Sequence, residues 1–281
     1  AALPVRPVER DGWDNATFRL GDAMSARLPT ADGYVPQVEK EARWLPVLAR
    51  SLPLPVPEPI AQGRPACGFP RPWSVNRWLE GEDAGVAAID DPVAFARDLA
   101  RFLVALRAID PTDGPAAGSH SFWRGGPLAV YDAETRAAIA SLGDRIDGPA
   151  ATRCWEAGLD RPWRGPRVWV HGDVAPSNLL VHEGRLAAVL DFGCCAVGDP
   201  ACDTVMAWTF FSGGAATIFR AALRLDDATW ARGRAWALWK ALITLRDHAD
   251  GETALAAVTR RVGWRAGAAE IVARACDETD A

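Results

Sequence analysis

Residues 170–193 read VHGDVAPSNLLVHEGRLAAVLDFG, and this stretch decides the fold. Two apolar, strand-like runs at 179–182 and 185–190 flank the pair Glu183 and Gly184. A two-residue turn containing a glycine, which accepts a positive φ, is typical of a β-hairpin. We therefore expect an antiparallel hairpin at the centre of this stretch.

Oxygen ligands converge at one end of the expected hairpin. The pairing that the turn implies sets Asn178 opposite Val189 and leaves Asp191 diagonally across from Asn178. Diagonal neighbours lie roughly 7–8 Å apart, within reach of a shared cation. A second carboxylate, Asp173, lies on the loop just before the hairpin. Hard oxygen ligands with open positions suit Mg²⁺ that carries substrate phosphates.

The spacing of these residues resembles the catalytic core of the aminoglycoside phosphotransferases. It is the small-molecule-kinase version of the protein kinase His-Arg-Asp, Asn and Asp-Phe-Gly set. The resemblance implies a bilobal, protein-kinase-like fold, with ATP or GTP as the phosphoryl donor and Mg²⁺ as the cofactor. The matching motifs are His171-Gly172-Asp173, Asn178, Asp191-Phe192-Gly193 and Gly198-Asp199-Pro200 with Asp203.

The resemblance assigns a role to each residue of the core. Asp173 is expected to be the catalytic residue, which accepts the proton of the substrate hydroxyl or holds that hydroxyl in line. Asn178 and Asp191 are expected to hold Mg²⁺ on the nucleotide phosphates. His171 and Asp203 are expected to support the catalytic loop without touching the substrate. For a single aspartate, turn formation is the alternative.

The N-terminal segment predicts a second hairpin. Runs at 17–20 and 23–28 flank a Gly-Asp pair, and the implied register sets Thr17 opposite Ala26. The loop 12–15 would then lie over the same end of the hairpin as Arg27. A backbone loop and a guanidinium together are suited to clamp a phosphate.

By the same resemblance, Arg27 is expected to contact the nucleotide phosphates, in a position where the family often carries a lysine. Arginine can fill this role because it is always charged and bidentate towards phosphate. Glu41 is its expected ion-pair partner, and the neighbouring Glu39 is the alternative. Asn15 and Thr17 are further candidates for phosphate contacts.

Nucleotide binding also needs an edge for the base. The resemblance places this edge at Trp78 and Leu79, where backbone groups are expected to meet the adenine. The break that follows, Glu80 to Asp83, is expected to be the hinge between two lobes. We expect residues 1–80 to form a nucleotide-binding N-lobe and residues 81–281 to form a C-lobe with the catalytic loop and the acceptor site.

The expected fold class is α+β, with a small antiparallel sheet in the N-lobe and a larger, mainly helical C-lobe. Apolar periodicity and start signals predict the helices. They are expected from near 37 with a kink or restart at Pro46, from 92 to 109, and around 131–142, 148–158, 200–211, 214–223, 227–248 and 253–276.

Composition limits the classes of partner and the cellular location. The 281 residues carry a net charge of −5, which argues against a nucleic-acid binder and agrees with a cationic acceptor. No apolar run approaches the roughly 20 residues that a bilayer span needs, so no membrane partner is expected. Without a recognisable signal peptide, and with six cysteines in no C-x-x-C pair, we expect a cytoplasmic protein.

We therefore expect an ATP- or GTP-dependent O-phosphotransferase that acts on a hydroxyl of a small molecule, first of all an aminoglycoside or related antibiotic. Choline-, homoserine- and fructosamine-type kinases share the core and remain open. A protein kinase is excluded because Gly198 follows Gly193 too closely for an activation segment. A nucleotide-binding pseudokinase is the alternative from another class, and a metal-dependent phosphohydrolase lacks a second cluster of ligands.

Acidic residues near the C-terminus bear on the acceptor. Asp247, Asp250 and Glu252 follow a helix, and three more acids close the chain. They are candidates for binding the ammonium groups of a polycationic acceptor. The alternative is a solvated acidic end.

Overall fold

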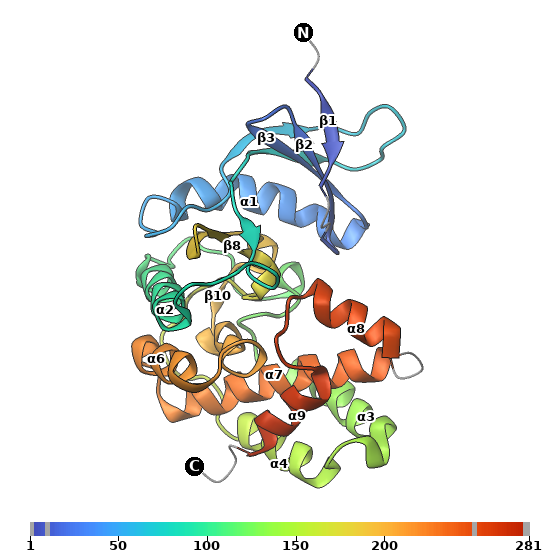
Figure 1. Ribbon diagram of the computed structural model, residues 1–281, viewed down its shortest axis with the longest axis vertical. Helices are drawn as coiled ribbons and strands as arrows, with labels where there is room; N and C mark the ends of the chain where they lie inside the picture. Colours follow the sequence, from blue (N-terminus) through green and yellow to red (C-terminus); the bar gives the residue numbers. More distant parts are fainter. Residues whose placement is uncertain (1–2, 9–11, 249–251, 278–281) are drawn as a thin grey trace.

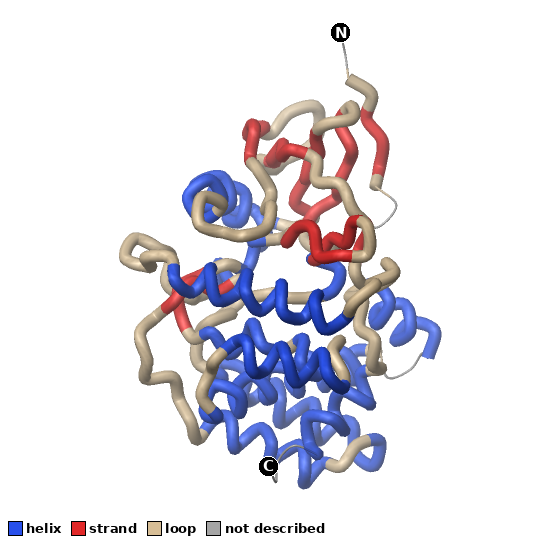
Figure 2. Tube along the Cα trace, turned by 60° about the vertical axis from the view of Figure 1, so that its left-hand side comes forward, coloured by secondary structure: helices blue, strands red, loops and turns tan. Residues whose placement is uncertain are grey.

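The computed structural model describes residues 3–8, 12–248 and 252–277, with a small β-rich part above a larger helical part (Figure 1). Figure 2 shows most strands gathered at the N-terminal end and helices filling the rest. The expected α+β class is confirmed. The upper part is an antiparallel sheet in the order β1 (Val5–Pro7), β2 (Asn15–Leu20), β3 (Met24–Pro29), β5 (Trp73–Arg77), β4 (Pro59–Gly63).

The β2–β3 hairpin differs by one residue from the expected register. Leu20 pairs with Met24, so the turn has three residues and not two, with Gly21 at φ 61°. The longer turn shifts every pair, and Thr17 lies opposite Arg27 instead of Ala26. Arg27 is thereby placed on the central strand of the sheet, between β2 and β5.

Helix α1 (Val35–Leu48) packs against β4 and β5. It begins two residues before the expected start and runs through Pro46 without ending there. Pro46 removes one N–H from the helical ladder. The ladder nevertheless continues, because the Ala49 N–H donates to the Leu45 carbonyl at 2.9 Å. The buried side of this helix carries Glu41 towards the sheet.

The expected catalytic hairpin is present as β8 and β9. Strand β8 also pairs with β6, so the chain that leaves the N-terminal sheet immediately joins the hairpin. A separate two-stranded ladder of β7 and β10 lies before and after the hairpin in the sequence. The bounds are Glu82–Asp83 (β6), Val168–Val170 (β7), Leu179–His182 (β8), Arg185–Val189 (β9) and Ala196–Gly198 (β10).

A β-bulge corrects the expected register of this hairpin. Val181 pairs with Leu186 but Leu180 pairs with Ala188, so that the intervening alanine is left without a partner across the ladder. Asn178 consequently lies across from Leu190, whose N–H donates to the Asn178 carbonyl at 2.7 Å, and not across from Val189. Asp191 is therefore the next residue after this pair, one position nearer along the strand than the regular ladder implied.

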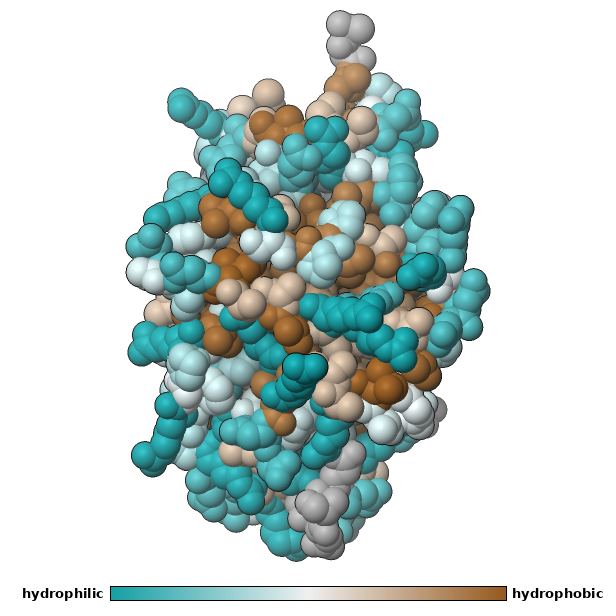
Figure 3. Space-filling model, turned by 90° about the vertical axis from the view of Figure 1, so that its left-hand side faces the viewer, coloured by the Kyte–Doolittle hydropathy of each residue, from teal (hydrophilic) through white to brown (hydrophobic). Residues whose placement is uncertain are grey.

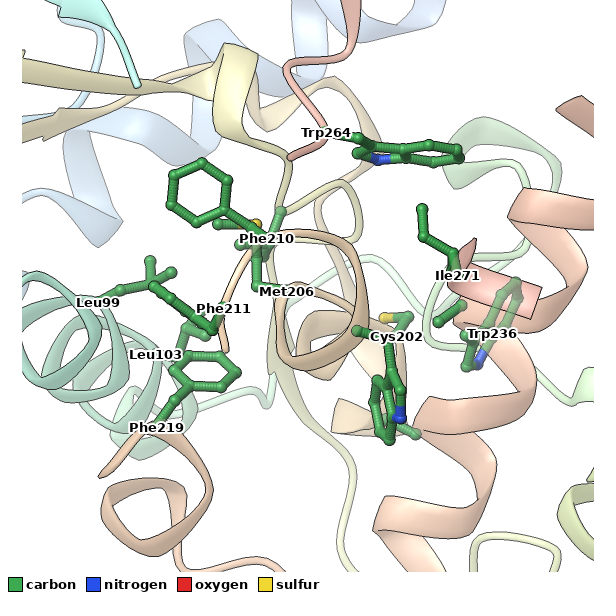
Figure 4. Packing of buried hydrophobic residues seen from close by; sticks show 14 of the residues in the cluster. Leu99, Leu103, Cys202, Met206, Phe210, Phe211, Phe219, Trp236, Trp264 and Ile271 are labelled. Atoms are coloured by element: carbon green, nitrogen blue, oxygen red, sulfur yellow. The ribbon is translucent and has the colours of Figure 1, made fainter. Parts of the chain in front are cut away.

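The helical part is built around α7, which packs against α3, α4 and α9, while α2 packs against α6. Figure 4 shows Leu99 and Leu103 of α2 beside Phe211 and Phe219, with Trp236 of α7 close to Ile271. The bounds are Pro92–Ala108 (α2), Asp132–Leu142 (α3), Gly148–Leu159 (α4), Met206–Thr209 (α5), Gly213–Leu223 (α6), Asp227–Asp247 (α7), Glu252–Arg261 (α8) and Ala268–Asp277 (α9).

Two of the expected helices are divided. The single helix expected over 253–276 is α8 and α9, separated by residues 262–267, in which Gly263 adopts φ 73°. The helix expected over 200–211 is a 3₁₀ turn at 200–204 followed by the short α5. The 3₁₀ turn begins where the Asp199 side chain accepts the Ala201 N–H at 3.1 Å.

Within the described part of the chain, no helix is long and apolar enough to cross a membrane. On the face drawn in Figure 3, apolar patches are separated by polar side chains.

A buried ion pair joins the segment after the hairpin to α7. Arg232 donates to both carboxylate oxygens of Asp199, at 2.6 and 3.0 Å, and both side chains are almost fully buried. Removing one partner of such a pair leaves an uncompensated buried charge. Asp199 thus has a structural role that a helix-start signal alone did not indicate.

Replacing Arg232 by Met is expected to lower the free energy of unfolding by about 3–5 kcal/mol, because Asp199 is left buried and unpaired. Urea unfolding of both proteins measures this. Arg136→Met, which breaks pairs with the half-exposed Asp132 and Glu156, is the control and is expected to cost about 1 kcal/mol or less. Equal losses of unfolding free energy in Arg232→Met and Arg136→Met would contradict the structural role of the Asp199–Arg232 pair.

Candidate active site

The backbone of the catalytic loop is fixed by Asp203, a buried carboxylate on the 3₁₀ turn. Its two oxygens accept the N–H groups of His171 and Gly172, each at 2.8 Å. Gly172 adopts φ 85°, and a Cβ there would lie 2.5 Å from the Cys194 carbonyl. Only glycine fits this approach, which presents the next residue, Asp173, to the cleft.

His171 is fully buried behind the loop. Its Nε2 lies 2.8 Å from the Leu190 carbonyl, and its ring packs edge-on against Phe192 at 4.7 Å. The imidazole therefore joins the loop before Asp173 to the end of the hairpin. It does not line the cavity to which Asp173 contributes.

Asp173 is held from two sides. The Asn178 amide donates to the Asp173 carbonyl at 2.9 Å and lies 3.4 Å from its Oδ2. On the opposite side, Lys240 Nζ lies 2.8 Å from Oδ1. Burial disfavours the charged carboxylate, but Lys240 and then Arg124 reverse this effect and lower the pKa of Asp173 to about 2. Asp173 is therefore ionised at neutral pH.

Lys240 and Arg124 were not found by the sequence reasoning. Lys240 comes from the middle of α7, and Arg124 comes from a loop of small residues, where its guanidinium stacks over Trp239 at 4.5 Å and over Trp236 at 5.3 Å. Nothing in their local sequence marks them. The one available signal was scarcity, since Lys240 is one of only two lysines in the chain.

Asp191 follows β9 and lines the same cavity as Asp173 and Asn178. It adopts a left-handed conformation with φ 60°, and its Oδ1 accepts the Gly193 N–H at 3.3 Å. The same oxygen lies 3.4 Å from Arg27 Nη2. This conformation turns the chain sharply after the hairpin and directs the carboxylate towards the N-terminal sheet.

The oxygens of Asn178 and Asp191 fit a Mg²⁺ ion that also binds phosphates. Their described hydrogen bonds use the amide group of Asn178 and Oδ1 of Asp191, so one oxygen of each side chain is left to face a ligand. Among the described residues, no group of three or more histidine, cysteine or carboxylate side chains is arranged to hold a metal. A site with one or two protein oxygens and substrate phosphates is typical of Mg²⁺.

Arg27 links the sheet, α1 and the hairpin. Its Nη1 lies 2.9 Å from Glu41 Oε2, while Nη2 reaches Asp191, and Glu41 is buried. Burial works against the charged guanidinium, but Glu41 and then Asp191 outweigh it and raise the pKa of Arg27 above its usual range. Glu39, the alternative partner, has no ion pair with Arg27 in the described residues.

An additional carboxylate, Asp14, lies on the loop over the cleft. Its Oδ2 accepts a hydrogen bond from Gln37 Nε2 of α1 at 2.8 Å. Burial, and next the charge of Asp191, raise the pKa of Asp14 to about 6. The loop residues Gly12, Trp13 and Asp14 line the cavity between this loop and the catalytic loop. Asn15 and Thr17, which belong to β2, lie outside its lining.

The segment expected to meet the base follows β5. The Trp78 N–H donates to the Ala23 carbonyl at 2.8 Å, so a base contact at this residue would need another backbone group. Arg19 stacks over the Trp78 ring at 4.3 Å and pairs with Glu80 at 2.9 Å. These contacts fix Trp78 and, through the chain, Leu79 at the end of β5.

These elements enclose one cavity of about 590 Å³. Its lining joins the N-terminal loop, the catalytic loop, the end of the hairpin, and two helices of the C-terminal part. The lining residues with ionisable side chains are Asp14, Asp83, Asp173, Asp191, Lys240, Arg260 and Arg261.

A match to a protein-family model identifies the family of this chain. The model of the phosphotransferase enzyme family (APH) matches residues 5–236, which include the sheet, the catalytic loop and the hairpin. The chain belongs to this family. The resemblance that residues 170–203 carried is thereby confirmed, and this phosphotransferase is an enzyme of the small-molecule kinase type. A search of curated proteins finds no match.

Solved structures share the fold of the phosphotransferase. A GDP and kanamycin complex of APH(2")-IIia has a TM-score of 0.72 at 17% identity, covering 99% of this chain and 95% of the other. A gentamicin complex of APH(2")-IIa gives 0.62 at 19%, with coverages of 96% and 93%. The macrolide 2'-phosphotransferase MphH from Brachybacterium faecium gives 0.61 at 22%, with coverages of 93% and 92%. At these identities the likeness is one of fold.

Replacing Asp14 by Asn is expected to tighten the binding of ADP without Mg²⁺ by about three- to tenfold at pH 8, because a carboxylate that repels phosphates is removed. At pH 5 the two proteins are expected to bind ADP alike, since Asp14 with a pKa of about 6 is then protonated. Calorimetry at both pH values measures this.

The control for this prediction is Asp32→Asn, which removes an exposed carboxylate, paired with Arg71, from the short turn before α1. It is expected to leave ADP binding unchanged at both pH values. If the ratio of the ADP affinities of wild type and Asp14→Asn is the same at pH 5 and pH 8, the raised pKa of Asp14 is contradicted.

Proposed function

We propose that this phosphotransferase transfers the γ-phosphoryl group of ATP or GTP to a hydroxyl of a small molecule. The observation that carries the proposal is the convergence of Asp173, Asn178 and Asp191 at one cavity, with Arg27 behind Asp191. In a kinase, these groups are needed for positioning and for neutralising charge on the transferred group. The GDP and ADP complexes among the structural neighbours support a nucleotide donor.

The donor side of the site would be formed by the N-terminal sheet and the end of the hairpin. Arg27 offers its guanidinium to the phosphates from β3, and Glu41 holds it in place. Asn178 and Asp191 would hold Mg²⁺, which when bound neutralises charge on the phosphates. The base would meet backbone near Trp78 and Leu79, and residues 1–80 would then form the nucleotide-binding lobe.

On the acceptor side, Asp173 would accept a hydrogen bond from the attacking hydroxyl and orient its oxygen towards the γ-phosphorus. The bond from that oxygen to phosphorus forms as the bond from phosphorus to the β,γ-bridging oxygen breaks. Because the transition state is loose, the hydroxyl keeps its proton until late in the reaction. A carboxylate with a pKa of about 2 therefore acts mainly by orientation and takes the proton late.

Lys240 would serve as a positioning residue for this step. Its ammonium group holds one oxygen of Asp173, while Asn178 holds the loop from the other side. The carboxylate is thereby kept in one orientation before any substrate binds. Such preorganisation reduces the cost of reaching the reactive geometry.

The pseudokinase alternative rested on the absence of a lysine near the phosphate position. Arg27 has the contacts that such a cation needs, since it pairs with both Glu41 and Asp191. This supports turnover over binding alone. Relatives named for aminoglycosides and macrolides make antibiotics with free hydroxyls the first acceptors to test.

The test is nucleotide turnover with Mg²⁺ over aminoglycosides, macrolides and small amino alcohols, in wild type and in Asp173→Asn. Turnover is expected to fall by about 100-fold or more in the variant, while nucleotide affinity stays the same, because the hydroxyl loses its orienting carboxylate. Asp98→Asn, far from the cavity on α2, is the matched control. Acceptor-dependent turnover that survives in Asp173→Asn would overturn the role of Asp173.

A further inference from the structure

The cavity has two sides with different charges. Asp14 and Asp191 belong to the donor side, because Gln37 of α1 and Arg27 of β3 hold them. The opposite side is formed by α7, which contributes Lys240, and by α8, which contributes Ala257, Arg260 and Arg261, with Val262 directly after it. Every ionisable side chain that these two helices contribute to the described lining is therefore cationic.

The position of α8 over the cavity is fixed by close packing at its end. A Cβ at Gly263 would lie 2.9 Å from Pro176 Cβ and 3.0 Å from Gly85 Cα, so this turn packs directly on the catalytic loop and on the chain after β6. Figure 1 shows α8 beside the catalytic hairpin and below the N-terminal sheet. The end of α8 that carries Arg260 and Arg261 is consequently held beside the loop that follows Asp173.

Arg261 is also anchored to the N-terminal loop. Its Nη2 donates to the Gly12 carbonyl at 2.7 Å, and its guanidinium lies 4.0 Å from the centre of the Trp13 ring. This contact closes the cavity between the loop and α8. The positive charge of Arg261 is thus a fixed part of the rim and does not depend on a freely moving side chain.

Of Asp247, Asp250 and Glu252, three of the acidic residues that were candidates for binding a polycation, only Asp247 has a described side chain. Asp247 pairs with its neighbour Arg246 at 2.7 Å and does not line the cavity. Asp250 lies outside the described residues, and the Glu252 side chain is also not described. On the acceptor side, Lys240 is paired with Asp173, and the other described charges of the lining are the cations of Arg260 and Arg261 and the carboxylate of Asp83.

We propose that the acceptor is a hydroxylated small molecule that carries an anionic group, such as a carboxylate, and not a polycation. The anionic group would face Arg260 and Arg261 while the hydroxyl reaches Asp173. This rests on the proposed phosphotransferase function and names the acceptor class of the same site. Complementary charge favours the anion, and the fixed cations oppose several ammonium groups.

The experiment measures Mg²⁺-nucleotide turnover with gluconate, glucose, glucosamine and kanamycin, which differ in charge. We expect kcat/KM to be highest for gluconate, with kanamycin the poorest acceptor. Raising the ionic strength is expected to reduce the preference for gluconate over glucose, because these charges are exposed and screened. If none of the four is turned over, their binding to the nucleotide-loaded enzyme by calorimetry gives the same ranking.

Arg260→Glu reverses one charge of the rim without touching Asp173 or Lys240. It is expected to lower kcat/KM, or affinity, for gluconate by about three- to tenfold and to improve both aminated acceptors. Arg185→Glu, on an exposed end of β9, makes the same charge change far from the cavity and is expected to have no effect.

Kanamycin or glucosamine outranking gluconate in wild type, or a ranking unchanged in Arg260→Glu, would overturn the proposed acceptor class and leave the phosphotransferase function standing. An enzyme that binds no nucleotide in a separate calorimetric titration would overturn both. The two failures are therefore distinguishable.

Discussion

The buried guanidinium of Arg27 is the constraint on which the rest of the site depends. It lies on β3, pairs with Glu41 of α1, and reaches Asp191 at the end of the catalytic hairpin. Three elements far apart in the sequence are thereby joined by one charge. Removing a partner from such a buried network leaves the others uncompensated, so the geometry of the phosphate side is maintained as a unit.

Around this link, backbone geometry does most of the positioning. Asp203 holds the catalytic loop through the N–H groups of His171 and Gly172, and the bulge in the hairpin sets Asn178 across from Leu190, directly before Asp191. The carboxylate of Asp173, the proposed catalytic group, then needs only lateral support, which Lys240 and Asn178 give. A reaction that depends on positioning requires that rigid elements hold the few oxygens that meet the substrate.

The sequence predicted the family and the fold class, and it brought Asp173, Asn178 and Asp191 together, because motif spacing and turn chemistry are local. It did not predict the registers of the β2–β3 and β8–β9 hairpins, because a three-residue turn and a bulge each shift the strand pairing by one residue. Lys240, Arg124 and Asp14 were missed because only tertiary packing brings them to Asp173 and Asp191. The roles of the site residues, and a lobe boundary near residue 80, remain predictions.

The measurement that tests the central claim most directly is calorimetric titration of Mg²⁺-ATP and Mg²⁺-GTP into wild type, Arg27→Met and Arg19→Met. Arg19 pairs with Glu80 at the edge of the sheet and is the matched control. The account predicts that wild type and Arg19→Met bind nucleotide, and that Arg27→Met loses affinity by about tenfold or more, as expected for a charge-assisted contact to phosphate. Equal affinity in wild type and Arg27→Met, or no binding by wild type, would contradict it.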